Sequence, residues 1–192
     1  MGTEKPSSKD IILETAARLF AKQGYHGTGL NQIIRESGAP KGSLYYYFPR
    51  GKEELAIACV NLIRRGLQDK IMEQMAKARK PADFMRNFVR DMADSIDVCG
   101  TDGLIPFGFW AAAETSAVSD SLRDACKVAF KEWKAILAAK LVELGVEHEL
   151  ADGKADLAVC LIEGATIMAI VERESRAMRR VAEHLPVILS VP

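Results

Sequence analysis

Cysteine and histidine are scarce in this chain of 192 residues, and their spacing suits no metal site. No C-x-x-C pair occurs among the four cysteines, which are Cys59, Cys99, Cys126 and Cys160. The three histidines lie far apart, at His26, His148 and His184. We therefore expect no metal and no cofactor, and cysteines that act as small buried residues. Because no secretory leader is evident, we expect reduced thiols and a cytoplasmic protein.

Catalytic signatures and long apolar runs are also missing. The sequence contains no G-x-S-x-G, no phosphate-binding glycine loop and no H-E-x-x-H, so we expect no enzyme. The most apolar stretch, residues 157–171, is interrupted by Glu163 and falls short of the roughly 20 residues that cross a bilayer. We therefore expect no membrane partner.

Sustained two-residue alternation, the mark of a half-buried strand, does not occur either. Apolar residues instead recur every three or four positions along the whole chain, which predicts an all-α fold of about nine helices. The first four are expected at residues 9–23, 30–37, 41–48 and 52–78. Five more are expected near residues 84–96, 106–114, 120–144, 150–173 and 176–189.

Charge is unevenly distributed although the chain as a whole is neutral. Residues 1–65 contain ten basic and six acidic residues, a net charge of +4, and the remainder contains 16 basic and 20 acidic residues, a net charge of −4. A basic end joined to an acidic body fits a protein that presents one end to phosphates. We place the domain boundary at the turn Pro49-Arg50-Gly51, which separates an N-terminal domain, residues 1–51, from a C-terminal domain, residues 52–192.

The expected helices 30–37 and 41–48 have the spacing of a helix-turn-helix, with Ser37-Gly38-Ala39-Pro40 as the turn. In such a motif the N-terminal residues of the second helix face base edges in the major groove. Leu44 and Phe48 lie four residues apart and can both face the core. Three consecutive tyrosines cannot all be buried, because successive residues on a helix are about 100° apart.

The expected DNA contacts combine donors, aromatic rings and a close backbone approach. Gly42 has no side chain and lets the helix backbone approach DNA. Lys52 is the first residue of the next helix, where its positive charge opposes the helix dipole but suits a phosphate. Thr28 is expected to cap the helix at 30–37 and could donate to phosphate as well. The full set of predicted DNA contacts is Thr28, Lys41, Gly42, Ser43, Tyr45, Tyr46, Tyr47 and Lys52.

These residues form a recognisable pattern. The segments GYHGT at 24–28, GAPKGSLYYYF at 38–48 and KEEL at 52–55 closely resemble the TetR family of bacterial repressors. The resemblance covers about residues 9–56. Isoleucine stands at 34 where alanine is common, proline stands at 40 where serine is common, and the turn before Lys52 is one residue longer than usual. The turn FPRGKEEL looks most like the subgroup of drug- and flavonoid-responsive repressors.

The resemblance implies a homodimer built mainly by the last two long helices, about residues 150–189. It also implies that two recognition helices occupy successive major grooves of a pseudo-palindromic operator. The apolar stretch 157–171 agrees with this, because a helix that is apolar around most of its circumference must be covered on more than one side. The alternative is a central helix buried within a single chain.

The C-terminal domain is expected to hold a pocket for a small hydrophobic or aromatic effector. The candidate lining residues are Met85, Phe88, Met92, Phe107, Trp110, Phe130, Trp133 and Met168. Trp110 with Phe107 is the first choice, and Glu114 and Glu163 are candidate polar anchors or members of ion pairs. Many of these positions could equally be ordinary core.

The helix at 52–78 is expected to link the pocket to the DNA contacts, so that effector binding separates the two recognition helices and releases DNA. Two alternatives stay open. One is an all-α enzyme that uses the apolar cavity, and the other is an adaptor that does not bind DNA.

Overall fold

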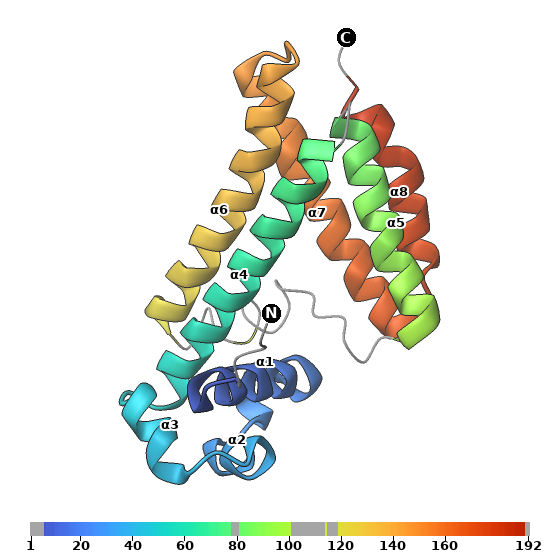
Figure 1. The fold of residues 1–192 in the computed structure, drawn as a ribbon. Coiled ribbons are helices and arrows are strands. Elements are labelled where there is room, and N and C mark those ends of the chain that lie inside the picture. The colour runs from blue at the N-terminus through green and yellow to red at the C-terminus, as the bar shows by residue number, and fades with distance from the viewer. Residues whose placement is uncertain (1–5, 78–80, 101–113, 115–118, 191–192) are drawn as a thin grey trace, which may run out of the picture. The chain divides into compact units, whose positions relative to one another are not determined.

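The computed structural model describes residues 6–77, 81–100, 114 and 119–190 (Figure 1). Within these ranges the secondary structure is helical and contains no strand, which confirms the predicted all-α fold. The eight helices are α1 (Ser8–Gly27), α2 (Leu30–Ser37), α3 (Lys41–Tyr47), α4 (Lys52–Lys77), α5 (Pro81–Cys99), α6 (Asp120–Glu143), α7 (His148–Glu172) and α8 (Arg176–Ile188). The helix predicted at 106–114 lies outside the described residues, apart from Glu114, which is in a turn.

The chain divides into two compact units. Unit 1 comprises residues 1–63 and 107–126, and unit 2 comprises residues 64–106 and 127–192. The first half of α4 belongs to unit 1 because its inner face is buried there, with Leu55, Cys59 and Val60 fully covered. The Cys59 thiol lies 3.7 Å from the carbonyl oxygen of Leu13 on α1, so α4 is in direct contact with the first helix.

Unit 1 is organised around α1. Ser7 caps this helix, since its hydroxyl accepts the N–H of Asp10 and the Asp10 carboxylate accepts the N–H of Ser7, both at 3.2 Å. The buried face contains Ile12 and Phe20. Gly24 has φ +76°, so the regular helix is interrupted there and only a short turn continues to Gly27.

Unit 2 is a helical bundle in which α8 packs against both α5 and α7 (Figure 1). Two polar connections fix these helices in register. The Arg179 guanidinium on α8 donates to Asp94 at 2.7 Å and to Asp97 at 2.5 Å on α5. The Lys154 ammonium on α7 donates to the carbonyl oxygens at the end of α8, those of Ile188 at 2.8 Å and Ser190 at 2.6 Å.

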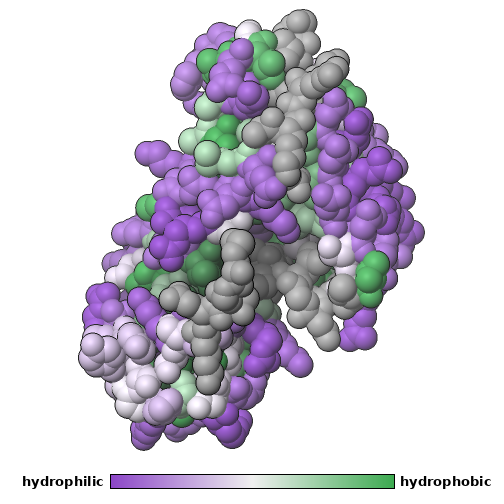
Figure 2. All heavy atoms as spheres, in the orientation of Figure 1, coloured by the Kyte–Doolittle hydropathy of each residue, from purple (hydrophilic) through white to green (hydrophobic). Residues whose placement is uncertain are grey.

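Hydrophilic side chains occupy most of the molecular face drawn in Figure 2, with apolar patches between them. No helix in the described ranges is long and apolar enough to cross a membrane.

Candidate nucleic-acid interface and internal cavity

The connection between α2 and α3 is a tight turn. Gly38 ends α2 with φ +64°, a left-handed conformation that glycine adopts without strain. Pro40 is the N-cap of α3, its φ of −54° is compatible with the ring, and its carbonyl oxygen accepts the N–H of Ser43 at 2.9 Å. The turn therefore delivers the N-terminus of α3 directly after α2, which is the arrangement of a helix-turn-helix.

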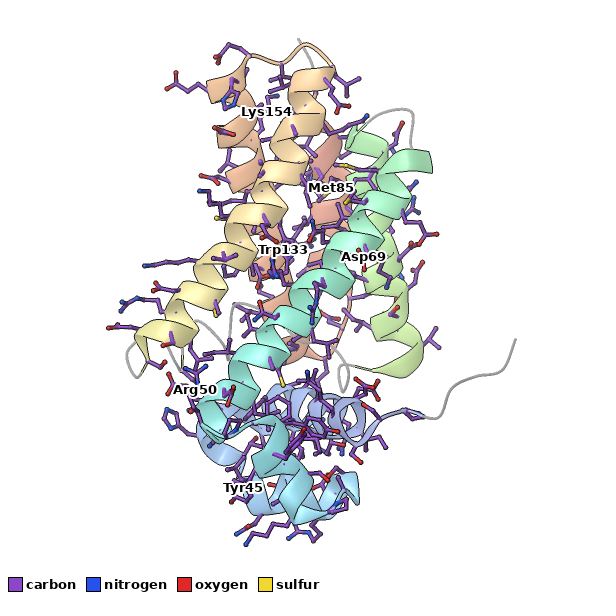
Figure 3. The ribbon with its side chains drawn as sticks, turned by 60° about the vertical axis from the view of Figure 1, so that its left-hand side comes forward. Tyr45, Arg50, Asp69, Met85, Trp133 and Lys154 are labelled. Carbon is purple, nitrogen blue, oxygen red and sulfur yellow. The ribbon has the colours of Figure 1, made fainter. Side chains whose placement is uncertain are left out.

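Helix α3 has one buried and one open face. Leu44 is fully buried and Phe48 nearly so, as the spacing predicts. Away from these residues Tyr46 is 78% exposed and Tyr45 is 44% exposed. Figure 3 labels Tyr45 on α3. Lys41 and Gly42 are exposed as well, whereas Ser43 and Tyr47 are partly covered. The outer face of α3, defined here as Lys41, Gly42, Tyr45 and Tyr46, thus presents an ammonium group and two phenol rings to solvent.

Gly42 has no packing role within the chain. A Cβ built at this position meets no atom within 4 Å, so an alanine would fit the folded protein without a clash. Glycine in a helix costs roughly 1 kcal/mol relative to alanine. No contact among the described residues therefore requires glycine at this position.

Thr28 occupies a different place from the one predicted. Its side chain is fully buried, and its hydroxyl donates to the carbonyl oxygen of Gly24 at 2.7 Å. The N-cap of α2 is Gly29, with no side-chain cap, so the prediction that Thr28 caps this helix is wrong. Because α1 is interrupted at Gly24, the carbonyl oxygen of that residue needs a donor, and Thr28 supplies it. A hydroxyl that is buried and engaged in this way does not support the predicted contact with phosphate.

Lys52 is the first residue of α4 and is only partly buried. Its ammonium group lies 4.5 Å from the centre of the Tyr25 ring, a cation–π contact that the sequence analysis missed. Burial lowers the pKa of Lys52, and the negative charge of Glu114 acts in the opposite direction. Burial also raises the pKa of Tyr25, and the charge of Glu53 adds to that effect. The Lys52 side chain is therefore held against the Tyr25 ring at the start of α4.

The connection between α1 and α2 is reinforced by polar side chains. The Arg18 guanidinium donates to the Glu36 carboxylate at 2.9 Å, and Gln32 donates to the other oxygen of that carboxylate at 2.9 Å. Gln23 joins the same network through Gln32, at 2.8 Å. The hydrogen bond from Gln32, followed by that from Arg18, lowers the pKa of Glu36. These contacts hold α2 against α1 and so fix the helix that precedes the outer face of α3.

Unit 2 contains an apolar cavity of about 60 Å³ that is partly open to solvent. Side chains from α4, α5, α6 and α7 line it, and they are Leu67, Ile71, Met75, Met85, Phe88, Trp133, Leu137, Val159, Ile162 and Glu163. Met85 and Trp133 lie within the bundle in Figure 3. Trp133 is held in place because its indole N–H donates to the carbonyl oxygen of Arg64, at 3.5 Å. Arg64 in turn forms an ion pair with Glu132 at 2.6 Å, which connects α4 to α6 beside the cavity.

The predicted pocket residues divide into three groups. Met85, Phe88 and Trp133 line the cavity, and so does Glu163, the predicted polar anchor. Met92, Phe130 and Met168 do not line it; Phe130 packs edge-on against Trp133 with ring centres 5.6 Å apart, and Met168 is 51% exposed on α7. Phe107 and Trp110 lie outside the described residues.

Two features of these sites escaped the sequence analysis. One is the wall of the cavity contributed by Leu67, Ile71 and Met75, which could have been found by extending the inward register of α4 beyond residue 63. The other is the place of Glu114, whose carboxylate accepts the backbone N–H of Tyr25 at 2.7 Å instead of facing the cavity. No sequence signal pairs residues that lie 89 positions apart.

Helices α1 to α3 form a three-helix arrangement with an open outer face on α3, and a separate unit contains an apolar cavity. Together these features define a helix-turn-helix transcriptional regulator. Comparison with protein families agrees. Residues 12–59 match the model for bacterial regulatory proteins of the tetR family. Residues 81–184 match the C-terminal domain of the transcriptional regulators LmrA and YxaF.

Similarity extends over nearly the whole chain. It is 40% identical to the uncharacterized HTH-type transcriptional regulator YxaF of Bacillus subtilis, over 97% of each protein. It is 39% identical to the HTH-type transcriptional regulator LmrA of the same organism, over 95% of this chain and 96% of the relative. The fold also matches the crystal structure of a TetR transcriptional regulator from Legionella pneumophila, with a TM-score of 0.86 and 18% sequence identity. The match covers 98% of this chain and 100% of that structure. The chain therefore belongs to the TetR family of transcriptional regulators.

Proposed function

We propose that this regulator is a repressor that binds a pseudo-palindromic operator as a homodimer and releases it when a small hydrophobic or aromatic effector enters unit 2. The observation that supports DNA binding most directly is the outer face of α3. Its lysine suits a phosphate, its tyrosine rings suit phosphates and thymine methyl groups, and Gly42 leaves the backbone open to close approach. Ser43, Tyr47 and Lys52 complete the proposed contact surface, and Thr28 is left out of it.

Dimerisation is supported by the outer face of α7. Leu157, Leu161, Met168 and Val171 are 57%, 38%, 51% and 77% exposed in the single chain. A Cβ built on Gly164 meets nothing within 4 Å, so a second helix could approach closely there. An apolar helix face of this extent is unfavourable in water unless another surface covers it. We propose that a second copy of the same chain covers it through about residues 150–189.

Effector binding is supported by the cavity in unit 2. Its walls are apolar apart from Glu163, which suits a hydrophobic ligand with one polar group. Ligand pockets for drug-sized molecules measure roughly 300–1,000 Å³, so the cavity must expand on binding. Because α4 contributes three of the lining residues and also begins at Lys52, expansion that displaces α4 would reach the DNA contacts. Near-complete release requires the effector to prefer the released state by about 5.5 kcal/mol.

Selection of duplexes from a random library with the purified full-length protein tests the proposal. The expected result is enrichment of an inverted repeat whose half-sites are separated as two successive major grooves require. The wild-type protein should protect this duplex from cleavage, and a variant with both Lys41→Ala and Tyr46→Ala should not. If wild-type protein enriches no sequence, operator binding is excluded.

A further inference from the structure

Glu114 connects a distant part of the sequence to the helices that precede the outer face of α3. Its carboxylate accepts the backbone N–H of Tyr25 at 2.7 Å and, more weakly, that of His26 at 3.4 Å. These two amides follow Gly24, where α1 is interrupted and backbone N–H groups lack helical partners. Glu114 therefore caps the last turn of α1 from a position 89 residues away in the sequence.

The absence of a side chain at Gly24 makes this contact possible. A Cβ built on Gly24 would overlap the Glu114 carboxylate, and the φ of +76° at this position also disfavours any side chain. Glycine therefore serves both purposes at position 24, because it permits the turn and it leaves room for the carboxylate. The contact is local to unit 1, to which residues 1–63 and 107–126 belong.

A second connection lies next to the first. The Ser119 hydroxyl donates to the Glu53 carboxylate at 2.5 Å and accepts the N–H of Leu122 at 3.1 Å, so it both caps α6 and binds the first turn of α4. Leu122 is fully buried. Lys52, beside Glu53, lies over the Tyr25 ring, and the negative charge of Glu114 acts on it. Glu114 thus binds the end of α1, and Ser119 binds the first turn of α4.

We propose that Glu114 is a positioning residue for operator binding, which holds the Gly24 turn and the Lys52 side chain in the arrangement that the DNA-bound state requires. This inference rests on the proposed operator binding and deepens it. The stretch 107–126 has residues of unit 2 on both sides of it in the sequence, at 106 and 127. The chain therefore enters this stretch from unit 2 and returns from it to unit 2.

Substitutions at Glu114 separate positioning from charge. Glu114→Ala removes both the acceptor and the charge, and we expect about tenfold weaker binding to the selected operator duplex, as for the loss of a charge-assisted hydrogen bond. Glu114→Gln keeps one acceptor oxygen and should weaken binding by only about threefold. The matched control is Glu14→Ala, which removes an exposed carboxylate from α1 in the same unit and should change affinity by less than about twofold.

Three results would overturn the proposal. If both Glu114 variants bind the operator as tightly as wild type or tighter, neither the hydrogen bonds nor the negative charge of Glu114 supports operator binding. If Glu114→Ala lowers only the melting temperature and leaves operator affinity unchanged, the residue is merely structural. If Glu14→Ala weakens binding as much as Glu114→Ala, the position of the carboxylate is irrelevant.

Hydrogen exchange on the wild-type protein provides a test that no folding defect can obscure. Coupling between sites is reciprocal, so operator binding should slow amide exchange in residues 119–126 as well as in α2 and α3. In Glu114→Gln the slowing in α2 and α3 should remain, and that in residues 119–126 should diminish. Slowing confined to α2 and α3 in the wild type would contradict the role of Glu114 but leave operator binding intact. No slowing in α3 would contradict operator binding itself.

Discussion

The outer faces of α3 and α7 both expose large side chains, but their chemistry differs. Helix α3 presents tyrosines, a lysine and an open glycine, so each exposed ring has a hydroxyl that water or phosphate can bind. Helix α7 presents leucine, valine and methionine, which have no such group. Exposure alone therefore does not define an interface. Amphipathic groups suit a polar partner such as DNA, whereas aliphatic groups suit a second apolar surface.

The largest expected effect comes from a charge on the α7 face. Leu161→Glu places a carboxylate on the proposed subunit interface. In a two-fold symmetric dimer each subunit contributes one such carboxylate, so the interface contains two. We expect a monomer, and operator affinity at least about 100-fold weaker because each module then binds alone. Sedimentation equilibrium and operator titration measure the two effects.

Val128→Glu is the matched control for that experiment, because Val128 is also a partly exposed aliphatic residue, on α6, at 47%. It should leave a dimer that binds operator normally. A Leu161→Glu protein that remains dimeric would show that another surface joins the subunits.

The next effect concerns the outer face of α3. Lys41→Ala should weaken operator binding by about 1 kcal/mol or more per subunit and reduce the dependence of log affinity on log salt by about 1 per subunit. Tyr46→Ala should weaken binding without lowering the melting temperature, since the ring is 78% exposed. Titrations at several salt concentrations measure both. An unchanged salt dependence in Lys41→Ala would mean that this lysine does not contact phosphate.

Gly42→Ala should change stability and binding in opposite directions. The folded chain has room for the methyl group, so the free energy of unfolding should rise by up to about 1 kcal/mol. Operator affinity should fall, because the same methyl group would stand between the backbone and DNA. The matched control is Gly66→Ala on α4, where an added Cβ also meets no atom within 4 Å. It should raise the free energy of unfolding without lowering operator affinity. Equal affinities of the two variants would remove the argument for close approach at Gly42.

The smallest effect on operator binding is expected on the inner side of α7, away from its outer face. Lys154→Met removes two hydrogen bonds to the end of α8, and we expect the free energy of unfolding to fall by about 1–2 kcal/mol. Dimerisation and operator affinity should be unchanged, because Lys154 is engaged by α8 of the same chain. Chemical denaturation measures the first quantity, and a monomeric Lys154→Met protein would place the subunit interface at the end of α8 instead.

Local patterns in the sequence predicted the helices well. The predicted limits of α2, residues 30–37, are those observed, and α3 ends one residue earlier than predicted. Apolar periodicity and the breaks at Gly24, Gly38 and Gly51 are short-range signals, and each of these glycines has a positive φ. The burial of Leu44 and Phe48 followed from their spacing on one helix.

The places of individual side chains were predicted less well than the limits of the helices. Thr28 was expected to cap α2 and to donate to phosphate, but its hydroxyl donates to the carbonyl oxygen of Gly24 instead. Met168 was grouped with the pocket by its chemistry, whereas the rotation of α7 places it on the outer face. Composition and periodicity do not specify which of two apolar faces a bundle encloses.

The order of the helices, the tight turn at Gly38 and the open side of α3 are therefore inherent in the sequence, because backbone preferences and helical spacing act within a few residues. The cavity lining and the contact of Glu114 with the Gly24 turn exist only after folding. They join residues from separate helices, and only packing of the whole chain specifies which of these meet.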